Sequence, residues 1–352
     1  MPESIMKREL IFTGVVKKTP NCGVSMKNKL FIDRFREVFD KVWIVGVKKS
    51  RMNLFFFPLQ ILHLIWLSLI HPKAIIVISS NSWESNIIIK ALDIFQQTKR
   101  IRFWVAGGSF HKFVGEKYSI ELFKKLYAIY VQSPKMVVAM KQKGFENVYY
   151  VPNSKRIDYL PTIQPKQTNN IKFVFLSRVH PDKGCGLIFD SVKRLNEIVG
   201  PKRFSVDFYG EIFPEYRQEF LQLVSSYQNV SYKGFLNLTE RDGYDTLAQY
   251  DVMLFPTYWH GEGFPGVVID AYISGLPIIA SDWNFNTDVV TESTGVIIPH
   301  HDQKRLEEEM MKFITGEYEI NSFRHYCQNT AKEYDNRLVL SEQHLKQIGM
   351  IN

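Results

Sequence analysis

Short apolar runs alternate with longer amphipathic segments along the whole chain of 352 residues. Such runs are typical of strands buried on both faces, and the segments between them have the spacing of helices that cover a sheet. In the first half the predicted strands are residues 10–15, 42–47, 75–79, 101–105 and 128–132. In the second half they are residues 172–176, 205–209, 230–232, 252–255, 278–280 and 295–298. The alternation predicts an α/β protein with two parallel sheets, one after the other.

A stretch rich in turn-forming residues separates the two halves, and we place a linker near residues 158–170. The pattern therefore predicts an N-terminal domain of residues 1–160 and a C-terminal domain of residues 170–334. Residues 335–352 follow as a C-terminal segment, with an amphipathic helix at about 335–348. In parallel sheets of this kind, ligands bind outside the carboxyl ends of the strands.

Charge is distributed unevenly between the halves. Residues 1–165 contain 26 Lys and Arg against 11 Asp and Glu, a balance of +15, whereas residues 166–352 contain 18 against 25, a balance of −7. A basic first half predicts an anionic partner. Because the sequence has no zinc finger, RNP-like motif or arginine-rich tract, an anionic membrane surface is favoured over nucleic acid, which we do not expect as a partner.

The most apolar stretch of the chain is residues 53–70, which Pro58, Gln60, His63 and Ser68 interrupt. These interruptions argue against a membrane span. Two interpretations are open: an ordinary core helix, which is favoured, and a helix that dips into a membrane surface. Residues 1–10 are charged and lack the apolar region of a secretory signal, so we expect a cytoplasmic protein at the inner face of the membrane.

The three cysteines, Cys22, Cys185 and Cys327, have no metal-ligand spacing, and we expect free thiols. No cluster of His, Asp and Cys has the spacing of a metal site either. The sequence therefore predicts no metal site and no cofactor.

Two acidic residues, Glu262 and Asp270, bracket a turn and the start of a predicted helix at about residues 265–274. Pro265 suits the first helical position, and the unpaired N–H groups of a helix start form an anion site. Gly263, Phe264, Pro265 and Gly266 are therefore predicted to contact a diphosphate. A surface turn with an acid near the helix start is the alternative interpretation for the motif in isolation.

With Gly275-Leu276-Pro277 and the apolar run after it, this motif resembles the nucleotide-sugar signature of the family 4 retaining glycosyltransferases. The resemblance implies the GT-B fold, in which two Rossmann-like domains face a central cleft and the C-terminal helix crosses back to the N-terminal domain. It also implies that Glu262 is catalytic and orients the donor sugar, and that Asp270 binds the ribose. The family usually has Glu at the position of Asp270.

Arg178 follows a predicted strand, and Lys183 precedes the next predicted helix. Both cations should overhang the ligand edge of the sheet, where a guanidinium fork and an ammonium suit a diphosphate. Solvated surface charges are the alternative for the pair taken alone. The pattern resembles the Gly-Arg-…-Lys-Gly element of the same family, with Ser177 in place of the glycine.

Three further positions end predicted strands where the family contacts the nucleotide base: Gly210, Gly234 and Phe235. In the first half, Gly23 lies before a predicted helix of residues 26–39 and permits a close approach of the backbone to a phosphate, with Ser25 as a candidate N-cap.

His111 is the candidate catalytic histidine, because family members often carry a His near the end of the preceding strand, facing the reacting sugar. His111 lies several residues later than that position. His260 is the rival candidate, and a surface His without a catalytic role is an equal alternative.

We therefore expect a metal-independent, retaining hexosyltransferase that uses a UDP- or GDP-linked sugar as co-substrate. The expected acceptor is a saccharide or a lipid-linked saccharide in cell-surface polysaccharide biosynthesis. A nucleotide-sugar epimerase of the same fold is one alternative. A non-catalytic protein that binds a membrane surface or nucleic acid is the other.

Overall fold

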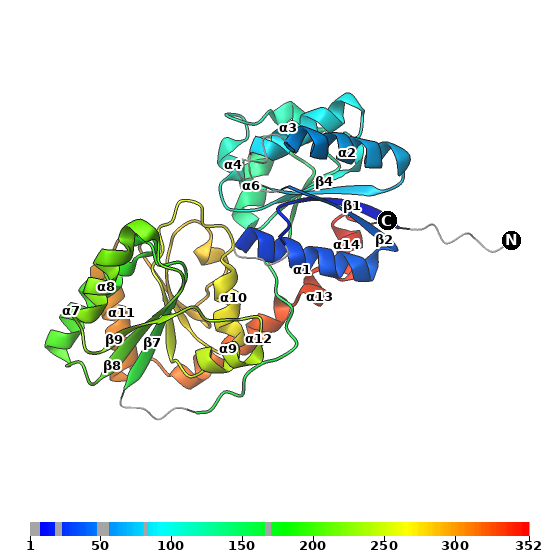
Figure 1. Ribbon diagram of the computed structural model, residues 1–352. Helices are drawn as coiled ribbons and strands as arrows, with labels where there is room; N and C mark the ends of the chain where they lie inside the picture. Colours follow the sequence, from blue (N-terminus) through cyan, green and yellow to red (C-terminus); the bar gives the residue numbers. More distant parts are fainter. Residues whose placement is uncertain (1–7, 18–22, 48–55, 81–82, 166–169, 352) are drawn as a thin grey trace. The chain divides into compact units, whose positions relative to one another are not determined.

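The computed structural model describes residues 8–17, 23–47, 56–80, 83–165 and 170–351. The chain forms two compact units, one of residues Met1–Arg156 with Asn336–Asn352 (unit 1) and one of residues Ile157–Asp335 (unit 2). Each unit is built around one six-stranded sheet in which the neighbouring strands are parallel (Figure 1). The two sheets predicted from the apolar runs are thus confirmed.

The sheet of unit 1 has the strand order β2-β1-β3-β4-β5-β6. Its strands are β1 (Glu9–Gly14), β2 (Lys41–Gly46), β3 (Ile75–Ser80), β4 (Ile101–Val105), β5 (Ala128–Val131) and β6 (Val148–Tyr150). The five predicted strands agree with β1 to β5 to within one residue at each end. The three-residue β6 was missed, because its short segment carries too few apolar positions to form a pattern.

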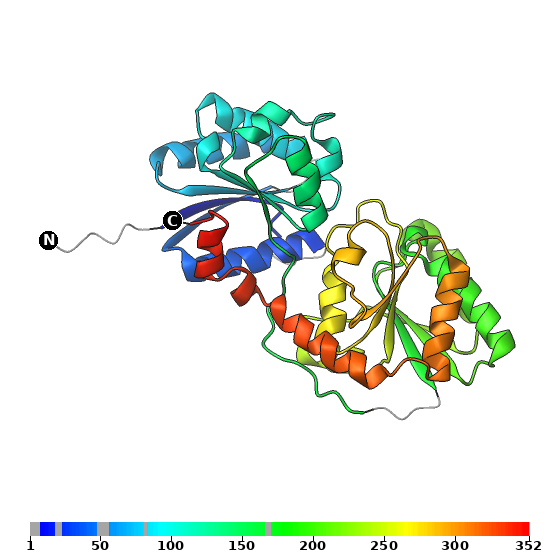
Figure 2. The same cartoon turned by 180° about the vertical axis from the view of Figure 1, so that it is seen from behind.

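Helices cover both faces of this sheet. They are α1 (Gly23–Val38), α2 (Phe57–Ile70), α3 (Trp83–Ile94), α4 (Phe110–Phe113), α5 (Ile120–Lys124), α6 (Pro134–Gln142), α13 (Asn336–Val339) and α14 (Glu342–Gln347). Helices α1 and α14 lie on one face, and α2 and α3 lie side by side on the other (Figures 1 and 2). Phe31 of α1, Trp104 of β4 and Leu345 of α14 share one apolar core on the α1 face.

The C-terminal segment differs from its prediction as one helix of residues 335–348. The long helix α12 (Ile320–Glu333) belongs to unit 2, and the chain then enters unit 1 as two short helices, α13 and α14. Ser341 is extended, and its hydroxyl accepts a hydrogen bond from His344 N at 3.3 Å. This N-cap separates α14 from α13. The spacing of apolar residues alone does not reveal such a break.

The sheet of unit 2 has the strand order β12-β11-β10-β7-β8-β9. Its strands are β7 (Ile171–Leu176), β8 (Phe204–Tyr209), β9 (Val230–Gly234), β10 (Val252–Phe255), β11 (Ile278–Ser281) and β12 (Gly295–Ile298). The helices around it are α7 (Cys185–Ile198), α8 (Arg217–Ser225), α9 (Arg241–Leu247), α10 (Gly266–Ile273), α11 (Gln303–Thr315) and α12. All six strands were predicted, because strands buried on both faces are nearly continuous apolar runs.

Two details of the predicted helix starts were wrong. Helix α1 begins at Gly23, so Ser25 is buried inside the helix and is not its N-cap. Helix α10 begins at Gly266, with Pro265 as the extended N-cap residue and not as the first helical residue. Cys22 lies outside the described residues, and Cys185 and Cys327 are buried free thiols, as expected.

Of the helices in the described part of the chain, none combines the length and the apolar content that crossing a bilayer requires. Helix α2, which lies within the apolar run of residues 53–70, is not an ordinary core helix. Leu64, Ile65, Leu67 and Ser68 are buried, whereas large apolar side chains on its other face are exposed. Residues 53–55 of that run lie outside the described residues.

Candidate active site

The predicted diphosphate ligands of unit 2 and Glu262 lie in the loops after β7 and β10, and these two strands and β11 are neighbours in the sheet. Three loops follow these strands, and their backbones are tied together. Tyr258 N donates to Asp182 O at 2.8 Å, and the hydroxyl of Ser281 donates to Thr257 O. Loops that are far apart in the sequence therefore form one rigid platform at the ligand edge of the sheet.

Gly184 is where the first of these loops can approach the second. It has φ +81°, and a Cβ at this position would lie 2.2 Å from the carbonyl oxygen of Pro256. Only glycine fits both the backbone conformation and the contact. The close approach brings the preceding residue, Lys183, under the β10 loop, where it is 6% exposed.

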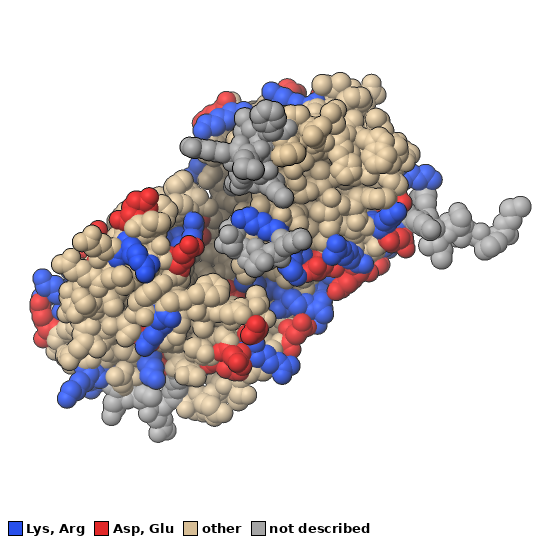
Figure 3. Space-filling model, viewed as in Figure 1, with Lys and Arg blue, Asp and Glu red and all other residues tan. Residues whose placement is uncertain are grey.

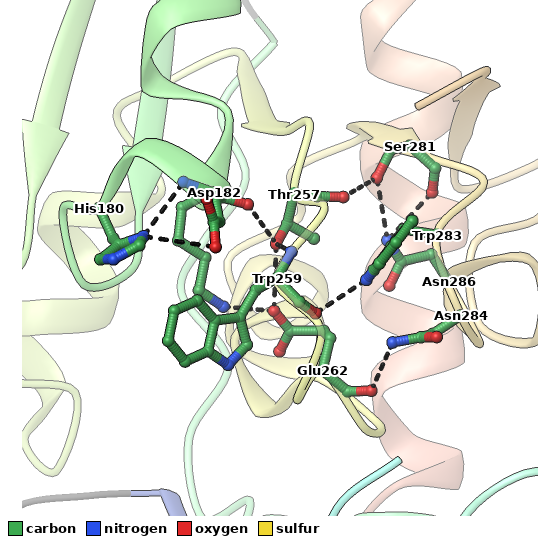
Figure 4. A network of polar contacts seen from close by, with 10 residues as sticks. His180, Asp182, Thr257, Trp259, Glu262, Ser281, Trp283, Asn284 and Asn286 are labelled. Atoms are coloured by element: carbon green, nitrogen blue, oxygen red, sulfur yellow. Dashed lines mark hydrogen bonds and ion pairs between the residues drawn. The ribbon is translucent and has the colours of Figure 1, made fainter. Parts of the chain in front are cut away.

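Lys183 and Glu262 form an ion pair between the two loops, and Figure 4 shows the polar network around Glu262. Its side chains are 7% and 13% exposed, and the ammonium contacts Oε2 of the carboxylate. The hydroxyl of Thr257 donates to the same oxygen at 3.2 Å, and Asn284 Nδ2 donates to the backbone oxygen of Glu262 at 3.0 Å. Removing one partner of such a desolvated pair costs far more than removing a surface ion pair.

Trp259 lies close to two of the predicted diphosphate ligands, Arg178 and Lys183. The guanidinium carbon of Arg178 lies 5.4 Å from the centre of its ring, and the ammonium of Lys183 lies 5.9 Å from it. Trp283 Nε1 donates to the backbone oxygen of Trp259 at 2.8 Å, and the ring of His180 lies 4.9 Å from the Trp259 ring. The indole thus supports both cations on one aromatic surface.

The segment from Gly263 to Gly266 leads from the ion pair into α10. Phe264 and Pro265 are buried, and the Phe264 ring packs on Tyr334 with 5.3 Å between the ring centres. Pro265 provides no side-chain cap for the helix. The N–H groups of the first turn are therefore suited to an anionic ligand.

Asp270 lies one turn inside α10 and is 5% exposed. Its Oδ1 accepts a hydrogen bond from the hydroxyl of Tyr244, on α9, at 2.8 Å. Burial, and after it the charge of Asp270, raises the pKa of the Tyr244 hydroxyl, which keeps it protonated and donating. The structure thus places Asp270 in a buried pair with a tyrosine that the sequence gave no reason to select.

The three predicted base contacts end β8 and β9. Gly210 has φ +136°, and a Cβ there would lie 1.7 Å from the carbonyl oxygen of Ser177, so glycine is required by backbone packing. Gly210 N donates to Gly234 O at 2.8 Å, which joins the two strand ends. Phe235, immediately after, is 80% exposed.

The two remaining predicted residues, His111 and Gly23, belong to unit 1. His111 lies on α4 and is half-buried. Burial, and then the neighbouring charges of Lys112 and Lys143, lower the pKa of its imidazole. Gly23 is exposed at the start of α1, and nothing lies within 4 Å of the place where a Cβ would be. His260, the rival histidine, is exposed in unit 2 beside Trp259.

Within the described residues, His, Cys, Asp and Glu side chains form no group of three that could hold a metal ion. The site residues that sequence reasoning missed are Thr257 and Trp259. The role of Thr257 follows from its bond to Glu262 within one loop, and that of Trp259 from its contacts with Arg178 and Lys183 on another loop. Neither residue type stood out in the local pattern.

Residues 170–315 match the protein family described as "Glycosyl transferases group 1". The match covers most of unit 2 and less than half of the chain, so it identifies a glycosyl transferase group 1 domain within unit 2. Comparison with curated protein sequences finds no match.

The whole chain is similar in structure to several glycosyltransferases. The apo form of the lipopolysaccharide outer core galactosyltransferase WaaB has a TM-score of 0.71 and 14% identity, over 98% of this chain and 100% of that one. Anabaena Alr3699/HepE in complex with UDP has a TM-score of 0.73 and 14% identity, over 97% and 100% of the two chains.

WaaG, a glycosyltransferase involved in lipopolysaccharide biosynthesis, has a TM-score of 0.65 and 13% identity, over 97% and 99%. At these identities the likeness establishes the fold. The chain has the GT-B fold, as the sequence motifs predicted.

Proposed function

We propose that this protein is a retaining, metal-independent glycosyltransferase that moves a hexose-type sugar from a nucleotide-diphospho-sugar to a saccharide or lipid-linked acceptor. The observation that carries the proposal is the buried Lys183–Glu262 pair, with Arg178 beside it on Trp259. This arrangement lies at the ligand edge of a glycosyl transferase group 1 domain. A non-catalytic protein that binds a membrane surface or nucleic acid would not require a buried ion pair at this edge of the sheet.

The two cations neutralise the diphosphate as it leaves the sugar. Arg178 offers a planar fork of N–H donors. The ammonium of Lys183 has three N–H donors, so those that do not contact Glu262 can donate to phosphate oxygens. The N–H groups at the start of α10, after Gly263, add to the same anion site. Because Lys183 and the start of α10 are held by packing before the reaction, they stabilise the developing charge without reorganising.

Glu262 orients the donor sugar. Its contacts with Lys183 and Thr257 both use Oε2, so Oε1 faces a sugar hydroxyl as an acceptor. The ion pair fixes the carboxylate in one position, which is the condition for precise placement of the reacting carbon. In this proposal the acceptor attacks the face of the sugar that the diphosphate leaves, which retains the anomeric configuration. We therefore assign no nucleophile of the protein.

The nucleoside occupies the remaining positions of unit 2. Asp270, together with the Tyr244 hydroxyl, holds the ribose hydroxyls, and the exposed ring of Phe235 stacks on the base beside Gly210 and Gly234. The base is that of UDP or GDP, and the nucleotide sugar is a co-substrate and not a cofactor.

Unit 1 contributes acceptor-side groups. The lowered pKa of His111 leaves a neutral imidazole at pH 7, which can accept a hydrogen bond from a sugar hydroxyl. Gly23 allows a phosphate to approach the start of α1. The proposed setting is cell-surface polysaccharide biosynthesis at the cytoplasmic face of the membrane.

The test is a thermal-shift screen of UDP- and GDP-linked hexoses, followed by a transfer assay with the donor that binds. A donor at 100 times its dissociation constant stabilises the native state by about 2.7 kcal/mol, which a melting curve resolves. If no nucleotide sugar and neither free nucleotide raises the melting temperature, the proposed function is wrong.

A further inference from the structure

Large apolar side chains of unit 1 are exposed along α2 and α3. They are Phe56, Leu59, Leu62, Trp66, Leu69, Ile70, Trp83, Ile87, Ile94 and Phe95, with exposed fractions from 39% to 78%. We refer to these residues as the α2–α3 apolar surface. They make up ten of the eighteen exposed large hydrophobic residues in the described part of the chain, within a stretch of forty residues. Single exposed apolar residues are ordinary, but a concentration of this size marks an interaction site.

The exposed residues of α2 recur at the spacing of one helix face, since Leu59, Leu62, Trp66 and Ile70 are three or four positions apart. The buried residues of α2 lie on the opposite face. No Lys, Arg, Asp or Glu occurs between Phe57 and Ile70, so neither face of α2 has the charged residues that normally cover a helix in water.

Helix α3 continues the surface. Its exposed Trp83 contacts Phe57 of α2 with 5.8 Å between the ring centres, and Ile87 follows one turn later. The two helices lie side by side on the same face of the sheet (Figures 1 and 2). A broad area without charged side chains covers α2 in the space-filling view (Figure 3).

Exposed lysines occur at the margins of the surface and, in one case, within its α3 face between Ile87 and Ile94, but not within its α2 face. Lys73 lies in the turn after α2, Lys90 on α3 and Lys99 beyond the end of α3. From residue 48 to residue 100 the sequence contains seven Lys and Arg against two acids. One of these acids, Asp93, is already paired with Lys125 at 2.8 Å.

We propose that the α2–α3 apolar surface inserts into the outer part of an anionic lipid bilayer, with α2 lying in the plane of the interface. Leu and Ile side chains enter the acyl region, and Trp66 and Trp83 lie at the headgroup level, where amphipathic rings are stable. The marginal lysines contact anionic headgroups. A second copy of the chain fits less well, because it would bring an equally basic margin against this one.

This inference deepens the proposed function, because it supplies the lipid partner that a lipid-linked acceptor requires. It also changes the expected binding from purely electrostatic attachment to insertion. Electrostatic attraction is screened by salt, whereas burial of apolar area is not. A part of the binding should therefore persist at high salt.

The experiment is co-sedimentation of the full chain with vesicles of equimolar phosphatidylglycerol and phosphatidylcholine, at low and high salt. The wild-type protein is expected to pellet at both salt concentrations, with less bound at high salt. The double variant Leu62→Glu/Trp66→Glu should lose at least tenfold in partition coefficient, because the charge at position 62 would have to enter the apolar region and the charge at position 66 would meet anionic headgroups.

Val138→Glu is the matched control, because Val138 is 56% exposed on α6, outside the α2–α3 apolar surface. It should bind vesicles like the wild type. Melting curves of all variants establish that they are folded. Failure of the wild type to pellet, or equal pelleting of the double variant, overturns the inference. So does a wild-type dimer in sedimentation velocity that the double variant converts to a monomer, since a second copy then covers the surface.

The outcome is independent of the proposed function. Nucleotide binding by unit 2 is measured without vesicles, and vesicle binding is measured without a nucleotide sugar. A protein that binds UDP but no vesicles disproves the lipid inference alone, and one that binds vesicles but no nucleotide disproves the proposed function alone.

Discussion

Each unit buries a lysine beside the carboxyl end of its sheet, and the two lysines have opposite surroundings. Lys183 of unit 2 pairs with Glu262 and lies close to Trp259. Lys27 of unit 1 lies on α1, 7% exposed, where its ammonium donates to Val105 O at 3.4 Å. In the described part of the chain no carboxylate forms an ion pair with Lys27.

The difference shows what a carboxylate does for a buried cation. Burial without an opposite charge lowers the pKa of Lys27 from 10.5 to about 7, so at neutral pH the amine is close to half neutral. Lys183 instead has the Glu262 carboxylate in contact with its ammonium. An opposite charge in contact compensates in part for the hydration that a buried cation loses.

The largest expected effect comes from breaking the pair. Glu262→Ala would leave Lys183 buried without a carboxylate, as Lys27 is, and would also remove the group that orients the donor sugar. We expect the transfer rate to fall on the order of 100-fold or more. We also expect the free energy of unfolding to fall by about 3 kcal/mol. Rates are compared on folded protein, with unfolding followed by urea titration.

Glu292→Ala is the control for this change, because Glu292 is an exposed acid of unit 2. It should leave both the rate and the stability unchanged. The double variant Glu262→Ala/Lys183→Met should regain stability but not activity. Near wild-type turnover of folded Glu262→Ala would refute the role given to this residue.

The two units also show which parts of the fold and of the candidate site can be predicted from the sequence. The apolar runs predicted eleven of the twelve strands in the described residues. Strands in parallel sheets are buried on both faces, so their apolar runs can be recognised without knowledge of distant residues. Glu262 and Lys183 were found because each lies where a strand meets a helix. Their mutual contact spans 79 positions, and only the folded loops reveal it.

Other features had no local signal at all. Trp259 became part of the site through its contact with Arg178 on another loop, Thr257 through its bond to Glu262 within one loop, and Tyr244 through its bond to Asp270. The exposed face of α2 was hidden for a different reason. A helix that is apolar all round does not indicate which face is buried.

The pH dependence of the free energy of unfolding tests the account of Lys27. Between about pH 7 and 10.5 the unfolded chain holds the Lys27 proton and the native state does not. The unfolded state thus binds more protons, so the contribution of Lys27 to the free energy of unfolding rises with pH, by up to about 1.4 kcal/mol per pH unit. Lys27→Met removes this contribution. We expect the variant to be more stable than the wild type below pH 7, with a difference that shrinks toward pH 10.5.

Urea unfolding of both proteins across this range measures the effect. Lys29→Met, at an exposed position of the same helix, should keep the wild-type slope. A difference between wild type and Lys27→Met that is the same at every pH would show that Lys27 has an ordinary pKa.

Trp259→Leu tests the aromatic support of the two cations in unit 2. Loss of the cation–π contacts, at about 1 kcal/mol, should weaken UDP or GDP binding by about fivefold. Tyr326→Leu removes an exposed aromatic side chain of α12 and should have no effect on binding. If Trp259→Leu binds UDP and GDP with the affinity of the wild type, the ring does not position the cations that bind the diphosphate.

The smallest expected effect concerns the base. Phe235→Ala should weaken nucleotide binding by about threefold, because one aromatic stacking contact contributes roughly 0.5–1.5 kcal/mol. Leu221→Ala, at an exposed position of α8, is the control. If Phe235→Ala binds UDP and GDP as the wild type does, the base lies elsewhere.

The central claim is that the paired lysine and its neighbouring arginine form the diphosphate site. Calorimetric titration of UDP and GDP into the wild type, Arg178→Ala and Lys183→Met tests it most directly. We expect the wild type to bind UDP or GDP and each variant to lose at least tenfold in affinity, measured at a temperature where melting curves show that the variant is folded. Unchanged affinity in both single variants would contradict the claim and place the phosphate site elsewhere in the molecule.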